Sequence, residues 1–280
     1  MSKYHRKPIT YTSQLSLTVS NLQESILYYT RVIGFLVIEQ DEGAAILGPN
    51  PESPLLFLTA SKKGRKPLRT TGLYHFALLL KERDQLANFL GHLLEHRIPY
   101  GSADHILTEA LYLNDPDGNG IEVYYDKKDT ELEASVDSLE MATLPLDQED
   151  LISVRSGSWT TLPENTMVGH MHLHVNDLDL AKEFYIDGLG FEIVAHYPGA
   201  LFISDGGYHH HLGLNIWKGE SAPVPPKDSL GLDWYNLVLA DEEKRERIIQ
   251  QLKDLSYEVS EEAGGFFTKD PAGNLIRLDL

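Results

Sequence analysis

The stretch QLSLTVSNLQESILYYTRVIGFLVIEQ, residues 14–40, decides the fold, because a second copy of its pattern, HMHLHVNDLDLAKEFYIDGLGFEIVAH, occupies residues 170–196. The two align without a gap at an offset of 156 residues, from Gln14 to His170. Each begins with the alternating apolar residues typical of a strand. Each continues through an Asn or Asp able to cap an amphipathic helix, and ends in a strand after Gly-Phe. The chain therefore contains an internal repeat.

A second pair of segments repeats more loosely. They are GLYHFALLLKERDQLANFLGHLLEH at 72–96 and GLDWYNLVLADEEKRERIIQQLKDL at 231–255. Both lead to one closing phrase, DPDGNGIEVYY at 115–125 and DPAGNLIRLDL at 270–280. Its Asp-Pro-x-Gly predicts a turn before a final strand. The sequence thus predicts an α+β fold of four units, each close to βαβββ.

The four units fall into two halves. We expect an N-terminal half at 8–128 with units one and two, a linker at 129–165, and a C-terminal half at 166–280 with units three and four. The linker region is acidic and shows no periodicity until about Leu151. With 280 residues, the chain has ordinary length for two domains.

Composition narrows the class of protein. A net charge of −18 argues against nucleic acid or an anionic membrane as partner. The absence of cysteine excludes disulfides, thiolate metal sites and a cysteine nucleophile. No apolar run approaches the roughly 20 residues that cross a bilayer, and the N-terminus shows no secretory signal. We expect a cytoplasmic protein. The sequence does not decide whether it forms a homo-oligomer.

Four βαβββ units, two per half, resemble the vicinal-oxygen-chelate superfamily, which includes glyoxalase I, extradiol dioxygenases and bleomycin-resistance proteins. The resemblance covers nearly the whole chain outside the linker. It implies that units pair into two curved mixed-sheet barrels and that one such pair surrounds a divalent metal. The ligands would come from the first strand of a unit and from the last strand of an even unit.

The repeat offsets carry these ligand positions along the chain. The positions are Gln14, His75, His170 and Trp234 on the first strands, and Glu122 and Arg277 on the last strands. Because Trp and Arg cannot ligate a cation, unit four has no ligand to offer. The resemblance implies a metal held by His75, Glu122 and His170, the two imidazoles and one carboxylate used by non-haem Fe(II) oxygenases. Fe(II) is the expected cofactor, and Mn(II) suits the same geometry.

The segment SADHILTEALYLNDPDGNGIEVYYD, residues 102–126, resembles the ring-cleavage pattern of extradiol dioxygenases. In that pattern a histidine is followed by five to seven residues, an apolar residue and tyrosine, then by two residues, Asp-Pro, a glycine turn and the ligand glutamate. His105, Tyr112 and Glu122 fill these positions, whereas Ala103 departs slightly from the usual residue. The resemblance implies that Tyr112 hydrogen-bonds a bound phenolate oxygen and that His105 stabilises charge on the ring or oxygen.

The histidine triplet in HHHLGLN, residues 209–215, supplies a further candidate. Extradiol enzymes carry an acid–base histidine in a His-x-x-small pattern, which His210 fits, with His211 as the alternative. An imidazole near its ordinary pKa can take a catechol proton and return it later. In an ideal strand His209 and His211 face away from His210, whereas a bulge would change this arrangement. His172 and His174 share a face with His170, where pocket, supporting or core roles are open.

Which units pair around the metal is left with alternatives. Units three and four would bring together only one ligand, and units one and two would offer Gln14, His75 and Glu122. Units two and three collect every useful residue, with units one and four as a structural partner. The linker is long enough for this third arrangement, which we therefore predict.

The leading functional hypothesis is an Fe(II)-dependent extradiol dioxygenase acting on a small aromatic diol and dioxygen. A glyoxalase-like isomerase or lyase is a second hypothesis, but it needs another carboxylate as base. The corresponding segments, PLLFLTAS at 54–61 and HHHLGLN, contain none, and Glu52 lies outside the strand. The third hypothesis is a metal-free protein that binds small molecules for resistance or sensing.

Overall fold

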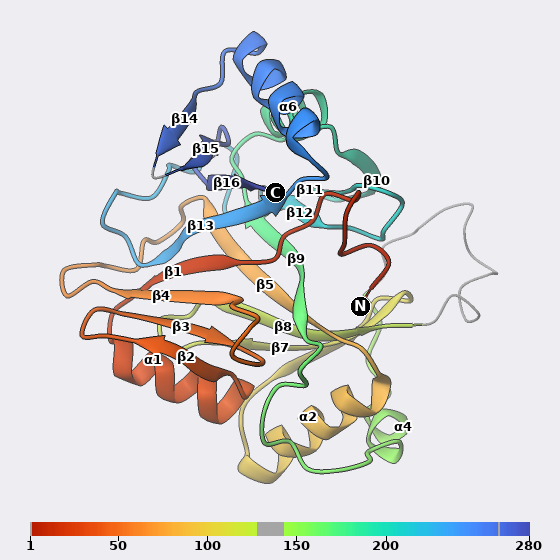
Figure 1. Cartoon of the computed structure of the whole chain (residues 1–280). Coiled ribbons are helices and arrows are strands. Elements are labelled where there is room, and N and C mark those ends of the chain that lie inside the picture. The colour runs from red at the N-terminus through yellow and green to blue at the C-terminus, as the bar shows by residue number, and fades with distance from the viewer. Residues whose placement is uncertain (1, 128–142, 263) are drawn as a thin grey trace.

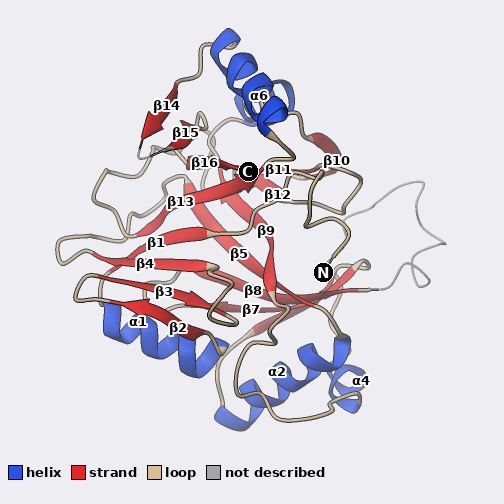
Figure 2. Ribbon diagram, viewed as in Figure 1, coloured by secondary structure: helices blue, strands red, loops and turns tan. Residues whose placement is uncertain are grey.

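The computed structural model of this chain describes residues 2–127, 143–262 and 264–280. Its strands form two curved, eight-stranded mixed sheets, and the helices lie on the outside of the molecule (Figures 1 and 2). Both sheets combine parallel and antiparallel strand pairs. The predicted α+β fold of repeated units is confirmed.

The elements follow the predicted order in each unit. Unit one contains β1 (Leu15–Val19), α1 (Leu22–Tyr28), η1 (Tyr29–Ile33), β2 (Leu36–Gln40), β3 (Ala44–Gly48) and β4 (Leu56–Ala60). Unit two contains β5 (Gly72–Leu80), α2 (Arg83–His96), β6 (Gly101–Asp104), β7 (Thr108–Asn114) and β8 (Gly120–Asp126). Unit three contains β9 (Met167–His174), α5 (Leu178–Lys182), η2 (Glu183–Gly188), β10 (Glu192–Tyr197), β11 (Ala200–Ser204) and β12 (Leu212–Asn215). Unit four contains β13 (Gly231–Val238), α6 (Glu242–Asp254), β14 (Val259–Glu262), β15 (Gly265–Lys269) and β16 (Leu275–Asp279).

The sheet order settles which units pair. One sheet runs β10-β11-β12-β9-β5-β8-β7-β6 and therefore joins units three and two; we call it the two–three sheet. The other runs β14-β15-β16-β13-β1-β4-β3-β2 and joins units four and one; we call it the one–four sheet. The antiparallel pairs β5–β9 and β1–β13 are the seams between units. The predicted pairing is confirmed, and the one–two and three–four alternatives are wrong.

The helices of the odd units begin as the sequence predicts. The side chain of Asn21 accepts a hydrogen bond from the Glu24 backbone N–H, and Asp177 accepts from Asp179 and Leu180. Such caps satisfy backbone donors that have no partner inside the helix. Both helices then continue into a π-helical turn, η1 and η2, which the sequence analysis did not predict.

The Asp-Pro-x-Gly-Asn turns are built around their aspartates. In unit two, Asp115 accepts from the backbone and the side chain of Asn119, at 2.7 and 2.8 Å, and Gly118 takes a φ of 78°. The buried hydroxyl of Tyr29, from η1 of unit one, donates to the same carboxylate at 2.9 Å. This turn in one sheet is therefore tied to a helix that belongs to the other.

Unit four contains the equivalent arrangement. Asp270 accepts from the backbone and side chain of Asn274, at 2.7 and 2.8 Å, and Tyr185 donates to it at 2.9 Å. Tyr185 comes from η2 of unit three, so the link again crosses from one sheet to the other. The two Tyr–Asp links fasten the two sheets together at symmetric places.

The predicted linker, 129–165, lies outside the described residues up to position 142. Its described part contains the short helix α4 (Gln148–Ser153), which packs beside α2. Farther on, the indole of Trp159 donates to the Ile33 carbonyl oxygen at 3.0 Å, and Leu162 donates its backbone N–H to Gly34 at 2.7 Å. The part of this connection that the structure describes thus packs against units one and two.

None of the described helices is both long enough and apolar enough to cross a membrane.

Candidate functional site

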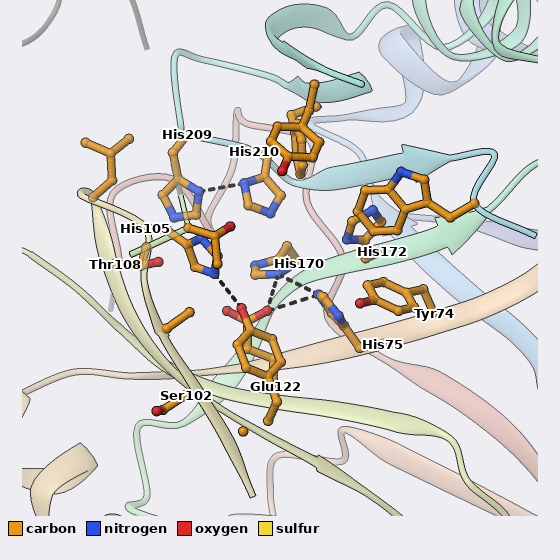
Figure 3. Close-up of a pocket in the computed structure, with 18 residues that line it drawn as sticks. Tyr74, His75, Ser102, His105, Thr108, Glu122, His170, His172, His209 and His210 are labelled. Carbon is orange, nitrogen blue, oxygen red and sulfur yellow. Dashed lines mark hydrogen bonds and ion pairs between the residues drawn. The ribbon is translucent and has the colours of Figure 1, made fainter. Parts of the chain in front are cut away.

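Strand register in the two–three sheet brings three predicted residues together. Glu122 on β8 lies opposite Ala77 on β5, and Ala77 lies opposite His170 on β9. His75 precedes Ala77 by two positions and so projects from the same face of β5. Ala77 adds only a methyl group between its two neighbours. The side chains of His75, Glu122 and His170 therefore converge, as Figure 3 shows.

The three side chains approach one another closely and are buried. His75 Nε2 lies 3.0 Å and His170 Nε2 lies 3.3 Å from Glu122 Oε2, and the two nitrogens are 3.4 Å apart. Neutral imidazoles offer too few hydrogens for all three contacts, since hydrogen bonds serve at most two of them. Ligands bound at about 2.1 Å to one cation stand about 3.0 Å apart in octahedral and about 3.4 Å apart in tetrahedral geometry. The donor set and its spacing thus fit a divalent metal.

The protonation states also suit a cation. Burial alone would raise the pKa of Glu122, but the imidazoles of His170 and His75 hold it well below its ordinary value. Burial lowers the pKa of His170 to about 4. An ionised carboxylate and a neutral imidazole are the forms in which these side chains bind metals. Among the residues that the structure describes, this is the one group of its kind.

The triad lines a cavity of about 360 Å³, whose lining side chains Figure 3 draws. Its other lining residues come from units two and three and from the start of the described linker. They are Tyr74, Gly101, Ser102, Ala103, His105, Leu107, Thr108, Tyr112, Thr143, His172, Tyr197, Phe202, His209, His210 and Trp217. All six residues predicted for the site therefore meet in one cavity.

His105 and Tyr112 form a pair on the β7 side of the cavity. His105 Nε2 lies 2.7 Å from the Tyr112 hydroxyl, and Tyr112 stands opposite Glu122 in the β7–β8 register. Burial, and then the negative charge of Glu122, raise the pKa of Tyr112 well above its ordinary value. The hydroxyl therefore keeps its proton and can donate a hydrogen bond.

His210 lies on the opposite side, in the turn before β12. Its ring centroid is 4.2 Å from that of His170 and 5.0 Å from that of Phe202. Burial and the neighbouring imidazoles lower the pKa of His210 well below its ordinary value, so the ring is neutral. Gly213, the small residue of the pattern, leaves room for the His172 ring, because a Cβ there would stand 2.8 Å from that ring.

His209 also lines the cavity, so the alternation expected of an ideal strand does not hold for it. Its Nδ1 lies 2.8 Å from His210 Nδ1, and its Nε2 lies 2.9 Å from Asp126 Oδ1. Strand alternation fails because residues 205–211 form a turn and β12 begins only at Leu212. The Asp-Gly-Gly at 205–207 is the turn signal that could have revealed this. Asp126, the last residue of β8, was not predicted either.

The remaining histidines of these strands point elsewhere or line the wall. His211 lies outside the cavity lining, donates from Nε2 to the Tyr4 carbonyl oxygen at 3.0 Å, and has its pKa lowered by burial to about 3. His174 Nδ1–H donates to Asn215 Oδ1 at 2.7 Å, and His174 is not among the lining residues of the cavity. His172 is a buried part of the cavity wall.

The corresponding positions in the one–four sheet carry different chemistry. The guanidinium of Arg277, where unit two has Glu122, donates to Gln14 at 2.7 Å and to Asp279 at 2.7 Å. It lies 4.3 Å above the ring of Trp234. A fixed positive charge at this place repels a metal ion, so only the two–three sheet presents the ligand triad.

Comparisons with known proteins agree with this fold. The model of the Glyoxalase/Bleomycin resistance protein/Dioxygenase superfamily matches residues 11–123 and 167–278. A curated protein named catechol-2,3-dioxygenase, from Bacillus subtilis (strain 168), is 43% identical over 268 residues, which is 94% of either chain.

Solved structures show the same fold at low identity. A candidate dioxygenase from Bacillus subtilis subsp. subtilis strain 168 matches with a TM-score of 0.68 at 12% identity, over 98% of this chain and 86% of that one. Glyoxalase I from Zea mays matches with a TM-score of 0.58 at 17% identity, over 96% of this chain and 92% of that one. On the strength of the matched family model and the curated relative, the chain belongs to the glyoxalase/bleomycin resistance protein/dioxygenase superfamily.

Proposed function

We propose that this protein is an extradiol dioxygenase that opens a catechol-type ring beside its two hydroxyl groups, with Fe(II) as its metal. The convergence of His75, Glu122 and His170 at the side of a cavity carries the proposal. The relative that is 43% identical and named catechol-2,3-dioxygenase supports it. Mn(II) suits the same ligands.

The three ligands set the charge of the centre. Two neutral imidazoles and one carboxylate leave a divalent cation with a net positive charge, which favours binding of a catecholate. Bound Fe(II) would supply the electron transfer that lets an aromatic diol react with dioxygen. The protein's own contribution is to orient the ring and to manage its protons.

The chain of Asp126, His209 and His210 supports one tautomer of His210. The Asp126 carboxylate accepts from His209 Nε2–H, which assigns the Nδ1 lone pair of His209 to the contact with His210. His210 then donates its Nδ1–H to that lone pair, which leaves His210 Nε2 as an acceptor. A neutral imidazole with a free Nε2 can take a catechol proton and return it later.

Tyr112 and His105 act on the other side of the ring. The protonated Tyr112 hydroxyl is placed next to Glu122 and can donate to a catechol oxygen. His105, 2.7 Å from that hydroxyl, stabilises charge that develops there.

Metal reconstitution with matched variants tests the proposal. Metal-free protein is loaded anaerobically with Fe(II), and metal content, oxygen uptake and the ring-opened product are measured with catechol. His170→Ala should lose the metal as fully as His75→Ala, because each removes one of three ligands. Gln14→Ala, at the repeat-related position in the other sheet, should keep it.

The outcomes separate the alternatives. Full metal loading without oxygen uptake from any catechol would exclude the dioxygenase and favour a glyoxalase-like reaction. For that reaction the described cavity lining offers no carboxylate besides Glu122. Failure to retain any divalent metal would favour a metal-free binding protein.

A further inference from the structure

We propose that the substrate's ring carries an uncharged, apolar substituent, and that this substituent lies against an aromatic rim formed by Tyr74, Tyr197 and Trp217. This inference rests on the proposed function, because it assigns the part of the substrate that extends away from the two hydroxyl groups.

The rim is a continuous aromatic surface drawn from three elements. Tyr74 belongs to β5 and Tyr197 to β10, and Trp217 follows β12. The Trp217 ring centroid lies 5.4 Å from that of Tyr74 and 6.3 Å from that of Tyr197. The three side chains are 41–44% exposed although all are large and aromatic. Exposed aromatic groups gathered at a cavity commonly mark a binding site.

The rim and the metal triad belong to one cavity. Tyr74 is adjacent to His75 in sequence, and their ring centroids are 5.0 Å apart. His172 stands between the rim and the triad, with ring centroids 5.3 Å from Trp217 and 5.0 Å from His75. Figure 3 shows Tyr74 and His172 beside the triad. A ring held at the metal therefore points one edge toward the rim.

Charge decides the chemistry of the substituent. The described residues that line this cavity include no lysine and no arginine. Lys127 is paired with Asp104 at 2.7 Å, and Lys218 lies outside the lining although it follows Trp217 in sequence. A carboxylate on the substituent would lose water without gaining a cation, which is costly. An ammonium group would find no carboxylate at the rim, because Glu122 is committed to the triad.

Volume limits the size of the substituent. About 360 Å³ is near the lower end of the range of about 300–1,000 Å³ for small-molecule sites. The cavity thus suits one aromatic ring with a short alkyl chain.

A matched panel of catechols tests this inference. Catechol is compared with its propyl, carboxymethyl and aminoethyl derivatives, substituted at ring position 3 or 4. Binding is measured calorimetrically on protein loaded with Zn²⁺, which binds without redox turnover, and kcat/KM is measured on the Fe(II) enzyme. We expect the better propyl isomer to bind about 10-fold more tightly than catechol, since each buried methylene favours binding. The charged derivatives should bind at least about 10-fold more weakly than that isomer.

Variants locate the effect at the rim. Trp217→Ala should weaken the propyl compound about 10-fold and leave catechol within about twofold, because an aromatic contact is lost only by the substituent. Leu180→Ala, an exposed apolar residue outside the cavity lining, is the matched control and should change neither affinity. Equal weakening of catechol and propylcatechol by Trp217→Ala would overturn the inference.

Other outcomes separate the rim from the reaction. The inference would be overturned if the carboxymethyl compound bound more tightly than propylcatechol and this preference were lost in Lys218→Ala. That result would show that a cation binds the substituent. Tighter binding of the aminoethyl compound would also overturn the inference. If the protein binds the propyl compound selectively but opens no ring, the inference about the rim stands and the proposed reaction is wrong. If the protein opens every catechol regardless of the charge on its substituent, the proposed reaction stands and the inference about the rim is wrong.

Discussion

At the scale of single residues, the hydrogen-bonded chain from Asp126 through His209 to His210 makes the sharpest prediction. His209→Phe removes the acceptor for His210 Nδ1–H, so His210 can exchange its tautomer. We expect kcat to fall about 10- to 100-fold, as for other residues that orient a site imidazole, while metal content stays unchanged. Nitrogen NMR of the metal-free protein should show a mixed tautomer at His210.

A second variant distinguishes orientation from packing. Asp126→Asn should shift the same tautomer balance, and the double variant should lose little more than either single variant, because both act through His210. Independent, additive losses with an unchanged His210 tautomer would contradict the assigned chain.

Some residues of the candidate site could be predicted from the sequence, and others could not. The repeat offsets led to His75, Glu122 and His170, because equivalent strands of repeated units place equivalent side chains at one point. They missed His209 and Asp126, since contact between them depends on a seven-residue turn, 205–211, whose path no repeat constrains. Register is predictable from pattern, whereas a turn between strands is shaped by its tertiary neighbours.

At the scale of elements, the two Tyr–Asp links are predicted to stabilise the fold, because each one holds an Asp-Pro turn to a helix of another unit. Tyr29→Phe leaves the buried Asp115 carboxylate without one donor, which should lower the free energy of unfolding by about 1–3 kcal/mol. Tyr28→Phe, on the adjacent and less buried ring, is the control and should stay within about 0.5 kcal/mol. Urea denaturation measures both, and an equal effect of the two substitutions would contradict the role of the link.

Strands and capped helices were the easier elements to predict. The alternation of apolar and polar residues in the strands and the helix caps at Asn21 and Asp177 are local signals. They can therefore be recognised without knowledge of the rest of the chain. The π-helical turns after α1 and α5 were not predicted; each contains a buried tyrosine that donates to a carboxylate of another unit, a tertiary contact that no local pattern signals. Helix α4 was likewise lost within an apparently irregular linker.

At the scale of the whole molecule, buried histidines predict loss of stability in mild acid. Burial lowers the pKa of His5 and His174 to about 4 and that of His211 to about 3. Below their ordinary pKa near 6.5 the unfolded chain binds these protons and the folded chain does not. Stability is therefore complete above that pH and falls as the pH drops toward 4, by about 1.4 kcal/mol per pH unit for each histidine.

Urea unfolding of metal-free protein between pH 7 and pH 5 measures this slope. His5→Gln keeps a donor for the Gly169 carbonyl oxygen and should reduce the slope by about 1.4 kcal/mol per pH unit. His196→Gln, at an exposed histidine, is the matched control and should retain the parent slope. An unchanged slope in His5→Gln would show that His5 is not a source of the acid sensitivity.

The nested pairing of units has a consequence for the order of biosynthesis. Strand β12 ends at Asn215, so the sheet that carries His75, Glu122 and His170 has all its strands before β13 begins at Gly231. Strand β1, in contrast, waits from Leu15 until β13 leaves the ribosome, which takes roughly 10–40 s at typical translation rates. The nascent chain can thus assemble the two–three sheet with its candidate site first, while the earliest strand to be made keeps an unpaired edge that a chaperone could cover.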